Sequence, residues 1–112
     1  TNLETATSNV FAIGDVNVVP SGDFAIPKAG VFAAGQGMKV GEVIASRINE
    51  TGEPEPYDGV GFCYMSYSGG RSATVGGEFL AEGGPDTILS EPTVSGMKSK
   101  DRFERDWRSF KI

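Results

Sequence analysis

The feature that most constrains this sequence is a proline-free run from Lys28 to Asn49, which has the pattern of a long helix. Pro27 suits the first turn of a helix, and Thr51-Gly52 followed by Pro54 supplies a stop. Apolar residues at helical spacing predict one apolar stripe along this helix, formed by Phe32, Val40, Val43, Ile44 and Ile48. We therefore expect a single long helix with one apolar side.

Small residues form a second stripe on another side of this predicted helix: Gly30, Ala34, Gly37, Gly41 and Ala45. An interior glycine costs ~1 kcal/mol relative to alanine, so a helix that keeps several of them is expected to be approached closely by something. Two interpretations stay open. The stripe packs tightly on a sheet, or the first turn of the helix contacts a ligand.

Amino-terminal to this helix, the sequence predicts a short buried strand followed by a loop. Val10–Ile13 is an apolar run closed by Gly14-Asp15, which is typical of a buried strand. Residues 16–27 contain the asparagine, glycine, aspartate and prolines of loops.

Carboxy-terminal to the helix, residues 57–80 predict a β-hairpin. Val60, Phe62 and Tyr64 alternate with other residues at the period of a strand, and Ser68–Arg71 provides a turn before the returning strand 72–80.

The remaining residues predict a loop over 81–97 and a short helix from Lys98 to Ile112. This helix would carry three aromatic residues on one face, Phe103, Trp107 and Phe110, with Asp101–Arg105 and Glu104–Arg108 pairs on the others. A short strand, a long glycine-rich helix, a hairpin and a terminal helix together predict an α+β fold.

Composition excludes several classes of function. The chain has no histidine, so it cannot by itself build a histidine zinc site, a Ser-His-Asp triad or a Cys-His pair, and we predict no metal site. Its single cysteine cannot form an internal disulfide. A formal net charge of −5 argues against nucleic acid as a partner. No stretch approaches the ~20 consecutive apolar residues of a membrane-spanning helix.

Asp15 is the first candidate site residue. A carboxylate at the carboxyl end of a buried strand lies where open α/β sheets bind ligands, and Gly14 beside it leaves room for one. The alternative is a turn aspartate that caps its own loop.

The start of the long helix, at Lys28, Ala29 and Gly30, is the second candidate. A helix amino terminus carries partial positive charge and unpaired N–H groups. Lys28 adds to that charge, and Gly30 lets a flat ligand approach the backbone. Such a site would stabilise a phosphate, a carboxylate or a reduced heteroaromatic ring. The alternative is a solvated lysine.

Cys63 in the first hairpin strand is the third candidate. A single cysteine is commonly a small buried hydrophobic residue. A reactive role needs a lowered pKa, and no Lys, Arg or His is adjacent in the sequence to supply it. A positive helix terminus brought near in space could do so.

These segments together resemble the FAD-dependent pyridine nucleotide-disulfide oxidoreductases. Residues 7–15, an apolar run ending in Gly14-Asp15, look like the second flavin-binding motif of that family. Ile26–Gly30 with the small-residue helix resembles the sulfide:quinone oxidoreductase and flavocytochrome c sulfide dehydrogenase branch. Residues 57–70 with Phe79 are similar to the segment that carries the downstream redox-active cysteine of that branch. The terminal aromatic helix is also similar, so the resemblance covers residues 5–112.

The resemblance implies a role for each candidate residue. Asp15 would bind the ribityl chain of FAD, with Gly14 giving room. Lys28, Ala29 and Gly30 would face the pyrimidine edge of the flavin and stabilise negative charge on the reduced ring. Cys63 would be the catalytic residue, pairing with an upstream cysteine.

On this resemblance we expect the chain to be the carboxy-terminal part of an α/β flavoprotein whose upstream part holds the dinucleotide-binding glycine turn. Residues 1–52 would complete the FAD-binding domain, and residues 53–112 would form an α+β interface region. The fragment alone is expected to be inactive, to bind FAD weakly and to self-associate.

The resemblance leaves the redox partner open among a quinone, a cytochrome and NAD(P), and the compartment open among cytoplasmic, membrane-peripheral and periplasmic. Two alternative functions remain. One is an NADH dehydrogenase-like flavoprotein with a packed cysteine, and the other is a standalone dimerisation module without redox chemistry.

Overall fold

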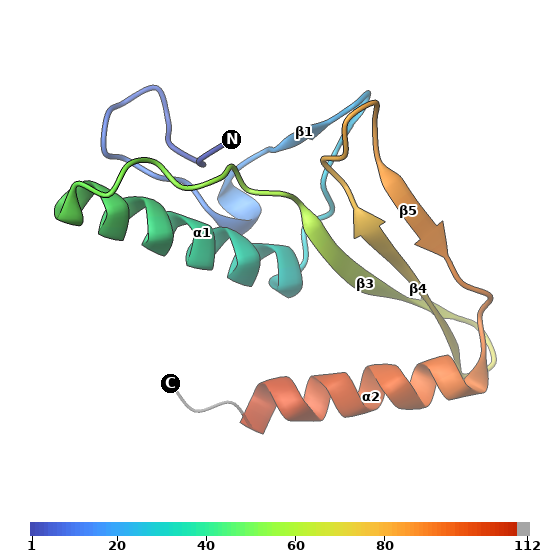
Figure 1. Cartoon of the computed structure of the whole chain (residues 1–112). Helices are drawn as coiled ribbons and strands as arrows, with labels where there is room; N and C mark the ends of the chain where they lie inside the picture. The colour runs from blue at the N-terminus through green and yellow to red at the C-terminus, as the bar shows by residue number, and fades with distance from the viewer. Residues whose placement is uncertain (110–112) are drawn as a thin grey trace.

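The computed structural model describes residues 1–109, which form two α-helices and two small antiparallel sheets (Figure 1). A two-stranded sheet pairs β1 with β2, and a three-stranded sheet has the order β3-β4-β5. The elements in chain order are η1 (Gly14–Val16), β1 (Pro20–Ser21), β2 (Phe24–Ala25), α1 (Gly30–Asn49), β3 (Val60–Tyr67), β4 (Arg71–Glu78), β5 (Asp86–Leu89) and α2 (Val94–Ser109). The α+β class expected from the sequence is confirmed.

Helix α1 is the predicted long helix, and it begins two residues later than expected. Ala29 has an extended backbone and is the N-cap, so Lys28 lies just outside the helix. At the other end Glu50 adopts a left-handed conformation with φ of 55°, and its N–H donates to the carbonyl of Ser46. This left-handed residue ends the helix before the predicted Thr51-Gly52 stop is reached.

The apolar stripe predicted for α1 is buried only in part. Phe32 and Val43 are 1% and 0% exposed, whereas Ile44 and Ile48 are 42% and 75% exposed. Figure 1 shows that the three-stranded sheet lies beside the start of α1 and that the second half of the helix extends beyond it. The predicted apolar stripe is therefore exposed at Ile44 and Ile48, although Val43 in the same half is buried.

The small-residue stripe of α1 does not pack on a sheet at Gly30, Gly37 or Gly41. A side-chain Cβ at Gly30 or Gly41 would meet no atom within 4 Å, and one at Gly37 would lie 3.6 Å from Cδ1 of Ile13. The close contact is instead at Gly35, where a Cβ would lie 3.3 Å from the ring of Tyr57. The sheet-packing interpretation is thus not supported, and Gly30 faces open space.

The predicted buried strand Val10–Ile13 does not form. Its only β-type pairing within residues 1–109 is an isolated bridge between Phe11 and Glu4. Val10 and Ile13 are also exposed, at 48% and 41%. A strand needs a neighbour along its length, and within residues 1–109 this segment has one only at Glu4. The predicted loop 16–27 also contains the short strands β1 and β2.

The predicted hairpin is confirmed as β3 and β4, paired from Val60 opposite Glu78 to Tyr67 opposite Arg71. The prediction of a loop over residues 81–97 is wrong, because β5 pairs with β4 there and α2 begins at Val94. Gly61 is required at its place in β3, since a Cβ there would overlap the ring of Phe32.

The core lies where α1, the hairpin and the amino-terminal segment meet. Its buried cluster consists of Leu3, Val19, Ile26, Phe32, Tyr57 and Phe79. The rings of Phe32 and Phe79 pack edge to face with centroids 5.0 Å apart. The core therefore takes side chains from both sides of the boundary expected at residues 52 and 53.

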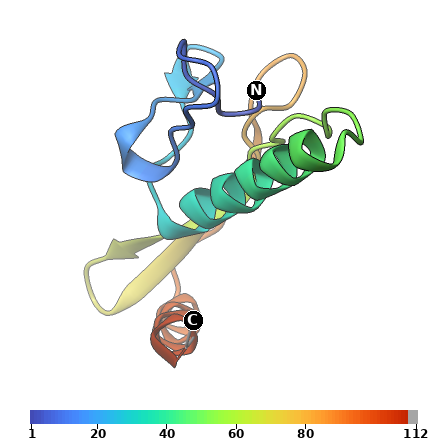
Figure 2. The ribbon, with the colours of Figure 1, turned by 90° about the vertical axis from the view of Figure 1, so that its left-hand side faces the viewer.

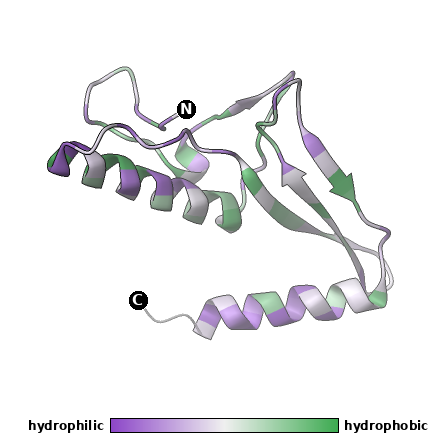
Figure 3. Cartoon of the chain, in the orientation of Figure 1, coloured by the Kyte–Doolittle hydropathy of each residue, from purple (hydrophilic) through white to green (hydrophobic). Residues whose placement is uncertain are grey.

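Helix α2 lies against the three-stranded sheet and apart from the amino-terminal segment (Figures 1 and 2). Phe103 packs on the rings of Phe62 and Tyr64, with centroids 5.4 and 5.7 Å away, and Trp107 follows on the same face. Figure 3 shows α2 mostly in purple and white, with few hydrophobic positions.

Of the predicted features of α2, the aromatic face with Phe103 and Trp107 is confirmed, and so is the Glu104–Arg108 ion pair, at 2.5 Å. No Asp101–Arg105 pair forms among the described residues. Phe110 lies outside the residues that the structure describes.

Candidate functional site

Four of the predicted cofactor residues line one small cavity at the amino terminus of α1. Gly14 and Asp15 enter it from η1, and Lys28 and Ala29 from the segment that leads into the helix. The cavity has a volume of about 10 Å³, which is close to the space that one water molecule needs. The fold thus brings two separate sequence motifs to one place, and this pocket by itself accommodates a single oxygen atom rather than a whole cofactor.

Lys28 and Asp15 are directly connected. The Nζ of Lys28 donates a hydrogen bond to the backbone carbonyl of Asp15. The carboxylate of Asp15 is exposed, and within residues 1–109 it accepts no hydrogen bond. The interpretation of Asp15 as a residue that caps its own turn is therefore not supported, and its carboxylate remains open to an external donor.

Gly14 adopts a conformation that favours glycine, with φ of 69°. A Cβ at this position would also lie 3.4 Å from the Cβ of Ala33 on α1. Backbone conformation and the close approach of α1 account for a glycine here without any ligand.

The first turn of α1 presents its backbone N–H groups without a side-chain cap. Ala29 provides no capping hydrogen bond, and the first turn contains no acidic residue. The N–H groups of the first turn of a helix have no partners inside the helix and carry partial positive charge. This end of α1 therefore keeps the donors and the field that an anionic ligand requires.

A second cavity of about 410 Å³ joins this end of α1 to Cys63. It is lined by Ala29, Gly30 and Val31 of the α1 start, by Phe62, Cys63 and Tyr64 of β3, and by Lys100, Phe103, Glu104 and Trp107 of α2. Its volume falls within the ~300–1,000 Å³ of small-molecule sites. Residues predicted from two separate motifs, Ala29 and Gly30 at the helix start and Cys63 in the hairpin, thus share one cavity.

A third cavity, of about 500 Å³, lies between α1 and α2. It is lined by Ala34 and Met38 of α1 and by Phe103, Asp106 and Trp107 of α2. Since Phe103 and Trp107 line both larger cavities, the two are neighbours and form an apolar groove between the helices.

The environment of Cys63 does not activate its thiol. Partial burial raises the pKa of Cys63 above the model-compound value of 9.0. The helix terminus that could have lowered this pKa does line the same cavity, yet desolvation determines the direction of the shift. The described part of the chain therefore keeps Cys63 protonated at neutral pH.

Two further residues shape the site and were not predicted from the sequence, Gln36 and Asn17. Gln36 is 2% exposed, lines the small cavity, and accepts hydrogen bonds from the N–H of Gly14 and from the Asn17 side chain. A polar residue on the face that carries Phe32 and Val43 was the available signal.

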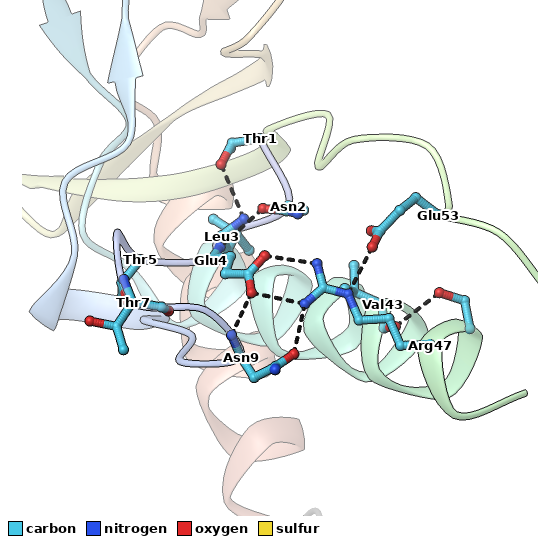
Figure 4. A network of polar contacts seen from close by, with 11 residues as sticks. Thr1, Asn2, Leu3, Glu4, Thr5, Thr7, Asn9, Val43, Arg47 and Glu53 are labelled. Atoms are coloured by element: carbon cyan, nitrogen blue, oxygen red, sulfur yellow. Dashed lines mark hydrogen bonds and ion pairs between the residues drawn. The ribbon is translucent and has the colours of Figure 1, made fainter. Parts of the chain in front are cut away.

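A polar network at the opposite end of α1 was also not predicted from the sequence (Figure 4). Arg47 pairs with both carboxylate oxygens of Glu4, at 2.8 and 2.7 Å, and with Glu53 at 2.7 Å. Asn9 accepts a further bond from Arg47, and the guanidinium lies 5.5 Å from the ring centre of Phe11. Arg47 lowers the pKa of Glu4 from 4.5 to about 2.

Within residues 1–109, no helix is long and apolar enough to cross a membrane. The same residues contain no cluster of three or more Cys, Asp or Glu side chains that could hold a metal ion. No protein-family model, curated protein or solved structure matches the chain.

Proposed function

We propose that this chain is the carboxy-terminal part of an FAD-dependent oxidoreductase of the sulfide dehydrogenase type. Its residues would contact the ribityl chain and the pyrimidine edge of the flavin. The observation that carries the proposal is the 410 Å³ cavity, in which the uncapped start of α1 and Cys63 lie together. The small cavity at Asp15 adjoins it, since Ala29 lines both.

The residues present are compatible with a flavin. The exposed carboxylate of Asp15 is available to accept hydrogen bonds from sugar-like hydroxyl groups. Lys28 and the N–H groups of the first turn of α1 would favour negative charge on a reduced ring. FAD would supply the electron-transfer chemistry, and these residues would orient it and stabilise its charge.

The exposed surface of the chain supports its being part of a larger protein. Its accessible area is 7660 Å², whereas a compact monomer of 11.8 kDa exposes about 5,900 Å². Its radius of gyration is 16.1 Å, against about 13 Å for a compact domain of this length. The excess of about 1,750 Å² is comparable to the area that one partner contributes to a large permanent interface.

A second candidate is favoured by the raised pKa of Cys63. In an NADH dehydrogenase-like flavoprotein the thiol would be a packed side chain, and a protonated thiol suits that role. In a sulfide dehydrogenase the thiol would need a lowered pKa, whereas burial raises it here. The two candidates share the flavin site and differ only in the use of Cys63.

The decisive experiment replaces Cys63 with serine in the full-length protein that carries these residues, and compares sulfide-dependent with NADH-dependent reduction of the flavin. Loss of the sulfide reaction with retained FAD would support the sulfide dehydrogenase. Unchanged sulfide turnover would leave the NADH-type enzyme as the better candidate.

Asp15→Asn tests the flavin site itself. It should weaken FAD binding by about tenfold, because a charged acceptor becomes a neutral one. Glu82→Gln, at an exposed position that lines none of the three cavities described at α1, is the matched control. A full-length protein that holds no flavin would contradict both candidates and favour the dimerisation module.

Sedimentation of residues 1–112 as a monomer at high concentration would contradict the expected self-association.

A further inference from the structure

Gln36 occupies a position where a polar side chain needs an explanation. It lies in the middle of α1 and is 2% exposed, on the same face as Phe32, whose side chain is 1% exposed. Burying an amide without hydrogen-bond partners is unfavourable, so buried amides are expected to have specific partners. The partners of Gln36 therefore indicate what the residue does.

The partners of Gln36 belong to the Gly-Asp turn. Its Oε1 accepts a hydrogen bond of 2.6 Å from the N–H of Gly14 and one of 3.1 Å from Nδ2 of Asn17. The same Nδ2 donates to the carbonyl of Ala12 at 2.7 Å, and the N–H of Asn17 donates to the carbonyl of Gly14. The side-chain amide of Gln36 thus binds both ends of the turn that carries Asp15, at Gly14 and at Asn17.

A second hydrogen bond from outside α1 also holds this turn, and the two bonds are called its tethers below. Lys28, just before α1, donates to the carbonyl of Asp15. Gln36, Lys28 and Asp15 all line this cavity of about 10 Å³. Asp15 is consequently held between a buried anchor within α1 and an exposed one at its start.

The two tethers differ in strength. Lys28 is an exposed, flexible side chain, so its bond competes with water and is expected to exchange readily. The Gln36 amide is sequestered, and loss of its oxygen would leave the N–H of Gly14 without that acceptor. The buried tether is therefore the one that fixes the geometry.

We propose that Gln36 is a positioning residue that holds Asp15 at a fixed place against the amino terminus of α1. The consequence for a cofactor rests on the proposed function, because Asp15 and the first turn of α1 are the two halves of the proposed flavin site. Gln36 itself does not bind the cofactor. It determines the separation of the two groups that do.

The experiment compares Gln36→Leu with Val43→Ala, because Val43 lies on the same buried side of α1 and makes no bond to the turn. The first readout is amide hydrogen exchange at Gly14 in residues 1–112, measured by NMR. In Gln36→Leu, exchange at Gly14 should be roughly tenfold faster than in Val43→Ala once both are compared at equal global stability. Equal exchange in the two variants would overturn the proposal.

Asn17→Ala is the second variant, because Asn17 is only partly buried and its loss spares the core. It should accelerate exchange at Gly14 less than Gln36→Leu does, since the bond from Gly14 to Gln36 remains. The double variant should show less than the sum of the two effects, as expected for residues in one network. Additive effects would contradict a shared tether.

The second readout is the dissociation constant of FAD in the full-length protein. Gln36→Leu should weaken FAD binding by roughly tenfold, whereas Val43→Ala should leave it within about twofold. Equal weakening in both variants would assign Gln36 a merely stabilising role and overturn the proposal. If the unmodified protein binds no FAD, the proposed function fails, and exchange at Gly14 still decides whether Gln36 positions the turn.

Discussion

The two ends of α1 are built in opposite ways. The carboxyl end is closed by the left-handed Glu50 and by Arg47, which binds Glu4, Glu53 and Asn9 (Figure 4). The amino end has no side-chain cap and no acidic residue in its first turn, and a side chain at Gly30 would meet no neighbouring atom within 4 Å. One end has its interactions satisfied within the chain, and the other leaves its donors facing two cavities.

The polar side chains have different roles at the two ends of α1. At the carboxyl end they join segments far apart in the sequence and stabilise the fold. At the amino end Gln36 and Asn17 hold the turn that carries Asp15 beside the first turn of α1. The backbone N–H groups of that first turn have no side-chain cap. An arrangement that organises a site without filling it is typical of binding sites rather than of cores.

The largest expected effect tests whether Phe32, near the start of α1, contributes more to the core than Ile48, near its end. Phe32→Ala removes a ring that is 1% exposed and packs edge to face on Phe79, so it should destabilise the fold by about 3–5 kcal/mol. Ile48→Ala, at a position 75% exposed, should cost less than about 0.5 kcal/mol. Urea denaturation followed by circular dichroism measures both. Similar losses would mean that the second half of α1 is covered by a partner in solution.

The features confirmed from the sequence are those with a local cause. The long helix, the hairpin with its Ser68–Arg71 turn and the aromatic face of α2 are each determined by residues close in the sequence. Their periodicity and turn residues could therefore be read directly.

The features that were missed depend on partners distant in the sequence. Residues 10–13 have strand composition but no neighbour along their length, and β5 is a four-residue strand that needs β4 beside it. The bond between Gly14 and Gln36 and the shared cavity of Gly30 and Cys63 also join distant positions. Spacing alone cannot predict such contacts, and only the resemblance of the motifs indicated that these residues belong together.

A second prediction concerns two glycines of opposite surroundings. Gly61→Ala would force a Cβ into the ring of Phe32 near the amino end of α1, and should destabilise the fold by about 1–3 kcal/mol. Gly41→Ala adds a Cβ in open space on α1, and should stabilise the helix by about 0.5–1 kcal/mol. Thermal unfolding of both variants gives the signs. A destabilising Gly41→Ala would show that this face of α1 is occupied in solution.

A third prediction concerns the reactivity of Cys63, which shares a cavity with the amino end of α1. Because burial raises its pKa, alkylation by iodoacetamide should be slower at pH 8 than for the same thiol in the urea-unfolded chain. The pH midpoint of the rate should lie above 9.0. A midpoint below that of the unfolded chain would mean that the helix terminus or Lys100 activates the thiol, as the sulfide dehydrogenase requires.

The smallest expected effect is at the carboxyl end of α1, where Arg47 binds the carboxylate of Glu4. Its folded-state pKa of about 2 lies below the unfolded value of 4.5, so its contribution to stability is present above pH 4.5 and is lost as the pH falls toward 2. Glu4→Gln should lower the melting temperature by about 1–3 °C at neutral pH, since ion pairs at the surface contribute little. The difference from the unmodified chain should disappear near pH 2.

The matched control is Glu4→Gln in an Arg47→Met background, where the carboxylate has lost its main partner. There the substitution should have a smaller effect on melting than in the unmodified chain, because the bonds from Arg47 are gone and the bond from the Asn9 N–H to Glu4 remains. Parallel melting curves for the unmodified chain and Glu4→Gln between pH 2 and 7 would contradict the depressed pKa. If the prediction holds, the network at the carboxyl end of α1 contributes modestly to stability while it joins the amino-terminal segment to α1 through Glu4 and Asn9.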